Sequence, residues 1–271
     1  SVRRSTACAS ATASEVHARP VSKASASVAR MGVAATPPKA SRARVTVPSA
    51  SRSMLNAAAT VTTKLKVGTG IALVIQRDPI ITAKEVATID QLSEGRFIFG
   101  VGNGWNQDEI ENHGTAFKTR HKLARERIEA MKAIWTMEEP EYHGEFVKFD
   151  KMKMWPKPYQ KPHPPIIVGG RLEYAAKRAF RYGDGWIPRD DWLETEGIES
   201  IHTFRKMAAD AGRDPASLPI SVFRHPENLD RLKLCQDLGI DRVVFTLPAE
   251  KEDKLLPIMD RWAELKHKLG I

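Results

Sequence analysis

The stretch RFIFGVGNGW, residues 96–105, decides the fold. After Arg96, every residue up to Val101 is apolar or glycine, which predicts a short strand that is buried on both faces (Arg96–Val101). The glycines that follow predict a tight loop directly after the strand. Because strands buried on both faces occur mainly in parallel sheets covered by helices, the stretch predicts an α/β fold.

Strand and helix signals alternate on both sides of this stretch. Further strands are predicted at Lys64–Val74, Pro165–Val168, Gly185–Ile187, Leu218–Phe223 and Arg242–Thr246. Helices are predicted at 79–94, Arg120–Trp135, Glu173–Tyr182, Leu193–Ala211, Pro226–Leu238 and Glu250–Leu269. Such alternation implies a parallel sheet whose strands are joined by right-handed crossovers.

The helix that follows Asp78-Pro79 has a clear start, because Asp78 can cap its first turn and Pro79 suits its first position. Its apolar spacing predicts that four side chains point inward, namely Ile81, Val86, Ile89 and Leu92. Residues 138–165 break the alternation, and Tyr142-His143-Gly144 with the proline-rich run predicts a hairpin and an extended crossing.

The six predicted strands make most of a (β/α)8 TIM barrel, a fold that typically takes roughly 250 residues. An eight-stranded barrel needs two more strands, which would have to precede Asn56. Residues 1–53 are instead rich in Ala, Ser, Arg and Pro and lack aromatic residues, so disorder is predicted. We therefore expect a disordered or non-native segment, 1–55, and an incomplete barrel domain, 56–271, without its first two strands.

The N-terminal segment also carries the basic charge of the chain. Residues 1–64 hold ten Lys and Arg residues and one acid, Glu15, which accounts for the whole net charge of +9. Three interpretations remain open for this segment: an organelle transit peptide, a plain disordered tail, or the product of a wrong reading frame. The domain that follows is neutral, so no nucleic-acid partner is expected.

Composition excludes several classes of protein. No stretch approaches the roughly 18 apolar residues of a membrane-spanning helix, so no membrane partner is expected and the protein should be soluble. The two cysteines, Cys8 and Cys235, form no metal or redox motif, which favours a cytoplasmic protein. No histidine pair has the spacing of a metal site, so no metal is predicted.

Three glycine clusters at predicted strands carry most of the functional signal. Gly68-Thr69-Gly70 lies within or just past the first strand, Gly102-Asn103-Gly104 follows the second, and Gly169-Gly170-Arg171 follows the third. Each one alone is more simply a tight turn. Because the carboxyl ends of parallel strands meet at one rim of a barrel, the three together predict a shared ligand site.

The third cluster suits a phosphate. A Gly-Gly pair at the start of a helix exposes backbone N–H groups, and Arg171 would add a bidentate cation. Asn103 could bind a cofactor ring or phosphate, or could form a turn. Trp105 is expected to pack rather than to line a pocket.

Taken together, these segments resemble the bacterial luciferase-like oxidoreductases, especially the deazaflavin-dependent branch. The resemblance lies in TTKLKVGTGI (62–71), DPIITAKEVATIDQLSEGRFIFGVGNGWNQDEIE (78–111), PPIIVGG (164–170), AFRYGDGWIP (179–188) and LGIDRVVFTLP (238–248). It implies a (β/α)8 barrel, often dimeric, that binds FMN or coenzyme F420 at the strand ends. It also implies that Gly68–Ile71 approach the ring, with a non-proline cis peptide as one route, and that Gly169 and Gly170 hold the phosphate.

The expected function is therefore hydride transfer between coenzyme F420 and a small organic substrate. One alternative is an FMN-dependent monooxygenase that uses molecular oxygen, and another is a truncated or frame-shifted product without activity. Family members contribute a pocket histidine from strands that residues 1–55 do not supply. For that reason the sequence identifies no catalytic acid or base.

Overall fold

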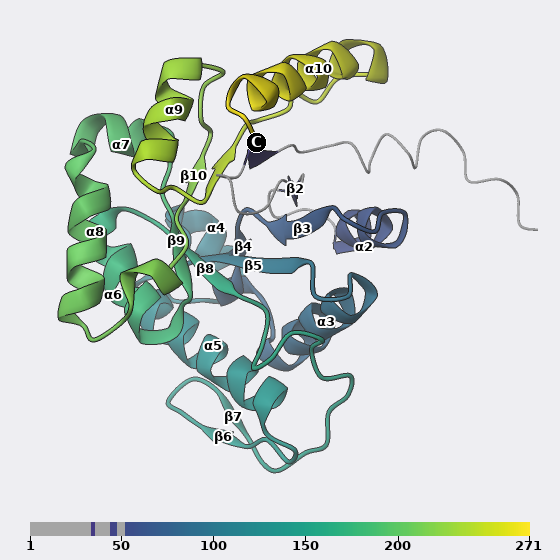
Figure 1. The fold of residues 1–271 in the computed structure, drawn as a ribbon. Helices are drawn as coiled ribbons and strands as arrows, with labels where there is room; N and C mark the ends of the chain where they lie inside the picture. The colour runs from purple at the N-terminus through teal and green to yellow at the C-terminus, as the bar shows by residue number, and fades with distance from the viewer. Residues whose placement is uncertain (1–33, 36–43, 48–51) are drawn as a thin grey trace, which may run out of the picture.

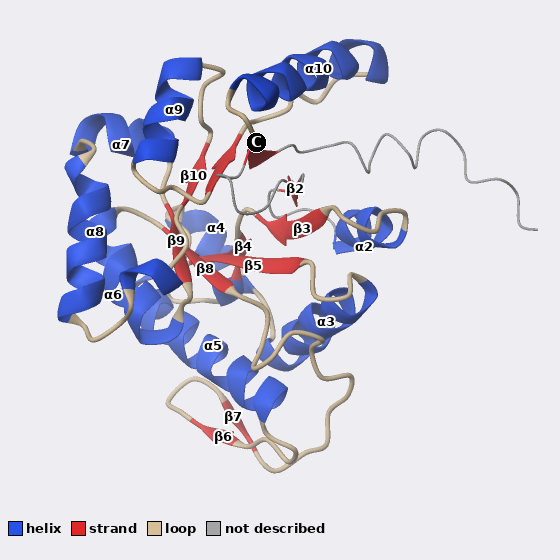
Figure 2. Ribbon diagram, in the orientation of Figure 1, coloured by secondary structure: helices blue, strands red, loops and turns tan. Residues whose placement is uncertain are grey.

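The structure, a computed structural model, describes residues 34–35, 44–47 and 52–271. Helices surround a central group of strands in this part of the chain (Figures 1 and 2). All six predicted strands are present, as β3 (Lys66–Thr69) with β4 (Ala72–Leu73), β5 (Phe97–Gly102), β8 (Ile166–Gly169), β9 (Gly185–Ile187), β10 (Ser221–Phe223) and β11 (Arg242–Val244).

The strands form a parallel sheet that follows chain order. Its order is β2–β3–β5–β8–β9, where β2 is Arg44–Val47, and β4 pairs with β5. Two parallel bridges, Trp186 with Ile220 and Arg189 with Phe223, join β9 to β10, which pairs in parallel with β11. Neighbouring strands in the chain are therefore neighbours in space, as expected for successive β–α crossovers.

The two ends of this sheet do not meet. At one end, β1 (Ala34–Ala35) pairs antiparallel with β11, and at the other end lies β2. Within the described residues no strand pairing joins β1 to β2. The described strands thus form an open α/β sheet and not a closed barrel.

Strands also occur ahead of Asn56, where the sequence predicted none. β2 occupies the edge beside β3, and helix α2 (Arg52–Thr60) begins before the predicted boundary. The segment RVTV is rich in β-branched residues, but four residues are too few to show a period within an Ala- and Ser-rich stretch. The disorder predicted for 1–33, 36–43 and 48–51 lies outside the described residues.

Most helices lie where strand–helix alternation predicted them. These are α3 (Pro79–Leu92), α5 (Arg120–Thr136), α6 (Leu172–Tyr182), α7 (Asp190–Glu196), α8 (Glu199–Asp210), α9 (Leu229–Asp237) and α10 (Glu252–Lys268). The short helix α4 (Gln107–Asn112) was not predicted. The single helix predicted over 193–211 is two helices, because Gly197 has a φ of +75° and ends α7. No described helix has the length and apolar content needed to cross a membrane.

Helix α3 begins at the predicted residue, but the side chains that it buries are not all the predicted ones. The Asp78 carboxylate accepts a hydrogen bond from the Ile81 backbone N–H at 2.8 Å. Val86 and Ile89 are buried, whereas Ile81 is 57% exposed and Leu92 is 46% exposed. The prediction was wrong for those two because small residues, Ala83 and Ala87 among them, occupy the inward positions.

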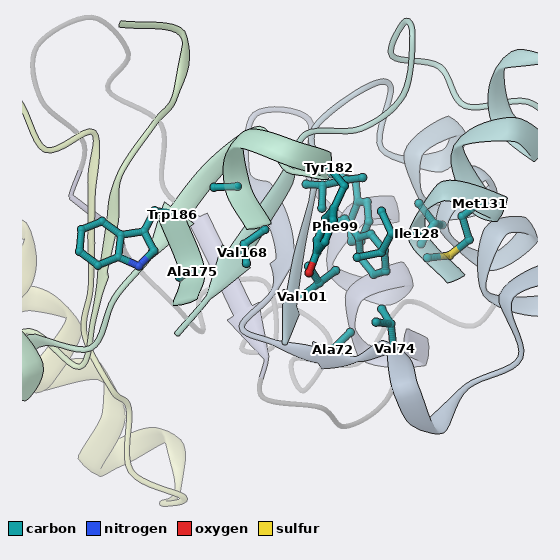
Figure 3. Close-up of a cluster of buried hydrophobic side chains, with 14 of the residues drawn as sticks. Ala72, Val74, Phe99, Val101, Ile128, Met131, Val168, Ala175, Tyr182 and Trp186 are labelled. Carbon is teal, nitrogen blue, oxygen red and sulfur yellow. The ribbon is translucent and has the colours of Figure 1, made fainter. Parts of the chain in front are cut away.

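Strands β5, β8 and β9 separate two apolar layers. Along β5, Phe97, Phe99 and Val101 belong to the large core between sheet and helices, part of which Figure 3 shows. Ile98 faces the other way and packs with Ile167 and Ile187 in a small inner cluster. Because side chains alternate along a strand, Gly100 and Gly102 share the inner face with Ile98.

The predicted hairpin is present as β6 (Tyr142–His143) and β7 (Lys148–Phe149). Glu126 of α5 holds it in place, since its carboxylate accepts hydrogen bonds from the backbone N–H groups of Phe146 at 2.7 Å and Val147 at 3.1 Å. Figure 1 shows the hairpin below α5, away from the sheet. The hairpin is thus an addition to the outside of the helix layer.

Candidate functional site

The first glycine cluster lies where β3 approaches β5 closely. A Cβ atom at Gly68 would lie 2.8 Å from the carbonyl oxygen of Ile98, and one at Gly100 would collide with the carbonyl of Thr69. The Thr69 hydroxyl donates a hydrogen bond to the Gly100 carbonyl at 2.7 Å. The Gly70–Ile71 peptide bond is cis. Bare main chain therefore forms this part of the inner face.

The side chain of Ile71 brings the three clusters together. A Cβ atom at Gly102 would collide with the Ile71 Cδ1 methyl, and one at Gly169 would lie 3.2 Å from the same methyl. Ile71 also packs against the inner cluster. Gly102 and Gly169, the last residues of β5 and β8, thus meet Ile71, which follows β3, at one rim, in agreement with the convergence that the sequence predicted.

In the second cluster, Gly104 and Asn103 have different roles. Gly104 has a φ of +69°, and a Cβ atom there would lie 2.9 Å from Ile110, so this glycine allows α4 to pack. The side chain of Asn103 is buried and lies 2.9 Å from Nδ1 of His121, at the start of α5. Trp105 is 87% exposed, so the expectation that it packs was wrong.

The third cluster leads into α6. Gly170 has a φ of +138°, a conformation that favours glycine, and its carbonyl accepts a hydrogen bond from the Trp186 indole at 2.8 Å. The first backbone N–H groups of any α-helix lack partners inside the helix. Together with the helix dipole, they can hold an anion such as a phosphate.

The guanidinium of Arg171 is directed toward α7. Its Nη1 lies 3.1 Å from the Glu196 carboxylate, and its Cζ lies 5.5 Å from the centre of the Trp192 ring. A different arginine stands beside the glycines. Nη1 of Arg178 lies 3.9 Å from the position that a Cβ atom of Gly170 would take. Phosphate binding by the Arg171 side chain remains a prediction.

Arg178 belongs to a basic cluster, which we define as Arg120, His121 and Arg178. Nη2 of Arg178 lies 3.5 Å from Nε2 of His121. Burial, followed by the charges of Arg178 and Arg120, lowers the pKa of His121 to about 4, although the residue as a whole is exposed. His121 is therefore neutral at physiological pH, and the cluster carries two positive charges.

Sequence reasoning did not identify His121 or Arg178. Both lie in helices, and only the packing of α5 against α6 places them beside the glycines. In principle, helix geometry offers a signal for Arg178, because side chains of α-helices lean toward the N-terminus and an arginine in the second turn can reach back to it. Nothing in the sequence relates that position to Asn103.

A second polar group lies at the other end of the sheet, around Asp190, His225, Arg231 and Cys235. Cys235 Sγ is 3.4 Å from His225 Nε2, and Arg231 pairs with Asp190 at 2.7 Å. Burial, followed by the charge of Asp190, raises the pKa of the thiol to about 12, so Cys235 is not a thiolate nucleophile at neutral pH. The adjoining cavity of about 60 Å³ is too small for a flavin.

The described residues contain no group of three or more His, Cys, Asp and Glu side chains that could hold a metal ion. The candidate functional site consists of the glycine rim, where Gly102, Gly169 and Ile71 meet, and the basic cluster beside it. Its chemistry is that of main-chain N–H groups, one amide and two guanidinium groups, which suits a flat molecule with an anionic tail.

Three curated proteins show what the chain is similar to. Uncharacterized protein Rv0953c of Mycobacterium tuberculosis is 41% identical over 214 residues, 77% of this chain and 73% of that protein. FMNH(2)-dependent dimethylsulfone monooxygenase of Pseudomonas putida is 35% identical, over 49% of this chain and 38% of that protein. F420-dependent hydroxymycolic acid dehydrogenase of M. tuberculosis is 30% identical, over 58% and 43%.

Among solved structures, monooxygenase RslO1 from Streptomyces bottropensis shares the fold, with a TM-score of 0.62 at 24% identity. The match covers 72% of this chain and 64% of that structure. The family model described as luciferase-like monooxygenase matches residues 26–228. The match therefore includes part of the N-terminal segment, 1–55, that the sequence analysis separated from the barrel domain. With this match over most of its length, the chain belongs to the luciferase-like monooxygenase family.

Proposed function

We propose that the protein is an oxidoreductase that binds coenzyme F420 at the glycine rim and transfers a hydride between it and a small organic substrate. The observation that carries the proposal is the convergence of Gly102, Gly169 and Ile71 beside the start of α6. An F420-dependent dehydrogenase among the relatives supports the choice of cofactor.

The residues of the rim fit such a cofactor. Gly169 and Gly170 with the first turn of α6 would hold the phosphate, because they offer N–H groups and no side chain at the point of closest approach. The main chain of Gly68–Ile71 would lie against the ring. Gly102 would leave room for the Ile71 side chain beneath the cofactor ring, because any larger residue at position 102 would displace that side chain.

The protein would contribute position and exclusion of water, while the bound cofactor supplies the hydride chemistry. Ile98, Ile167 and Ile187 are buried on the inner face and would keep water from beneath the ring.

A second candidate is an FMN-dependent monooxygenase. It is favoured by the similarity to an FMNH(2)-dependent monooxygenase and by the fold shared with RslO1. The same rim would serve, since FMN also joins a flat ring to a phosphate. The two candidates differ in the reaction and in the anionic tail.

Titration of the purified chain with F420 and with FMN, followed by quenching of ligand fluorescence, tests the proposal. We expect saturable binding of F420. Saturable binding of FMN without F420 would replace the first candidate by the second. If a folded chain binds neither ligand, both candidate functions are rejected.

A further inference from the structure

We propose that Arg178 neutralises the phosphate of the bound cofactor, and that Asn103 and His121 position it. The inference deepens the proposed function and rests on it. It replaces Arg171, which the sequence singled out, by a residue whose place only the fold reveals.

The first argument is charge balance. Other arginines nearby are satisfied by carboxylates: Arg171 pairs with Glu196, and Arg181 lies 4.0 Å from Glu129. Among the described residues, no carboxylate forms an ion pair with Arg178, Arg120 or His121. Burial, followed by the nearby charge of Arg178, lowers the pKa of Arg120. Two like charges held together without an anion are destabilising, and a bound phosphate would relieve them.

The second argument is location. The guanidinium of Arg178 lies beside Gly170, whose missing side chain leaves room between the arginine and the start of α6. The Arg120 side chain is held by Phe117. Its Nη1 donates a hydrogen bond to the Phe117 carbonyl at 2.7 Å, and its Cζ lies 3.6 Å from the centre of the Phe117 ring. A phosphate at the α6 N-terminus would therefore meet backbone N–H groups and a guanidinium together.

The third argument is the hydrogen-bond arrangement of His121. Its ring is neutral, so one ring nitrogen donates and the other accepts. The amide nitrogen of Asn103 lies 2.9 Å from Nδ1 and can only donate, so Nδ1 is the acceptor and Nε2 carries the ring proton. The 3.5 Å contact between Nε2 of His121 and Nη2 of Arg178 therefore joins two donors, both of which can donate to an anion. The chain Asn103–His121–Arg178 thus links the second glycine cluster to the third.

The test compares a phosphorylated cofactor with its phosphate-free counterpart, namely FMN with riboflavin, which lacks only the phosphate. Where wild type binds F420 and not FMN, F420 and its phosphate-free deazaflavin–ribitol core take the places of FMN and riboflavin, with the same expected outcomes. Arg178→Met keeps most of the aliphatic stem and removes the charge. We expect it to weaken FMN binding by about tenfold to a hundredfold, as for loss of a charged hydrogen bond, and to leave riboflavin binding unchanged. Arg178→Lys should recover part of the loss. Arg181→Met, on the same helix, is the matched control and should behave as wild type.

Two outcomes overturn the inference while leaving the proposed function intact. One is wild-type FMN affinity in a folded Arg178→Met variant, and the other is a phosphate-specific loss in Arg171→Met instead. If wild type binds no flavin or deazaflavin, the proposed function fails, and thermal stabilisation by inorganic phosphate then tests Arg178 separately. Phosphate stabilisation of wild type but not of Arg178→Met would support the inference, and equal or absent stabilisation would overturn it.

The positioning role of His121 has its own readout. His121→Leu removes both ring nitrogens, and we expect FMN affinity to fall several-fold with riboflavin affinity unchanged. His121→Gln keeps a polar side chain that can accept from the Asn103 amide and still donate, so it should restore FMN binding. A loss that Gln does not rescue, or that extends equally to riboflavin, would show that His121 only supports packing.

Discussion

The indole N–H of Trp186 donates a hydrogen bond to the carbonyl oxygen of Gly170, at 2.8 Å. Trp186 is fully buried in β9 and stacks on Phe204 at 5.0 Å between ring centres. The bond ties the loop after β8 to the core behind β9. The loop that would hold the phosphate is therefore fixed from the helix side of the sheet.

We expect Trp186→Phe to destabilise the protein and to weaken phosphate-dependent binding. Trp262→Phe is a close control, because Trp262 is also fully buried and stacks on Phe245, while its indole nitrogen has no hydrogen-bond partner among the described residues. The free energy of unfolding, measured with urea, should fall by about 1–2 kcal/mol more for Trp186→Phe than for Trp262→Phe. Equal losses would mean that the bond to Gly170 contributes nothing measurable.

Glu126 makes the stability of the hairpin depend on pH. Burial alone raises its pKa, but the hydrogen bonds from the Phe146 and Val147 N–H groups outweigh burial, and the pKa is lowered below its ordinary value of 4.5. A carboxylate with a lowered pKa in the folded state stabilises the protein at neutral pH. That stability is fully present above pH 4.5 and is lost as the pH falls through the lowered pKa.

Glu126→Gln should therefore lower the free energy of unfolding at pH 7 by about 1 kcal/mol and flatten its decline below pH 4.5. The matched control is Glu145→Gln in the same hairpin, whose side chain is 63% exposed and 3.8 Å from Lys122. An exposed pair of this kind contributes little, so the control should stay near wild type. Urea titrations at pH 7 and pH 4 measure both. Equal behaviour of the two variants would contradict the role of Glu126.

Much of the fold follows from local patterns in the sequence. Residues 96–105 predicted a buried strand followed by a glycine loop. The structure confirms the strand as β5, which is buried throughout and ends at Gly102, and Gly104 lies in the loop that follows. β2 was missed because RVTV is too short to show a period. The inward face of α3 was partly wrong because Ala83 and Ala87, which carry little apolar signal, face the sheet in place of Ile81 and Leu92.

The site was predicted to the extent that it consists of backbone. Parallel strands bring their carboxyl ends together whatever their side chains are, so the meeting of Gly102 with Gly169 could be expected. The side chains that join them depend on helix packing. Arg178 and His121 approach one another only because α5 and α6 are neighbours, and Arg171 turns away because Glu196 lies within reach.

The contact between Gly102 and Ile71 offers the most direct test of the convergence. Gly102→Ala would place a Cβ atom against the Ile71 Cδ1 methyl, so we expect a loss of roughly 1–3 kcal/mol in the free energy of unfolding and weaker cofactor binding. Ile71→Val removes that methyl and alone should cost about 0.5–1.5 kcal/mol. In the double variant one methyl replaces the other, so its loss should be smaller than the sum of the two single losses. Urea denaturation of the four proteins measures this coupling. Strictly additive losses would mean that the two residues do not touch, and that the glycine rim is not assembled around Ile71.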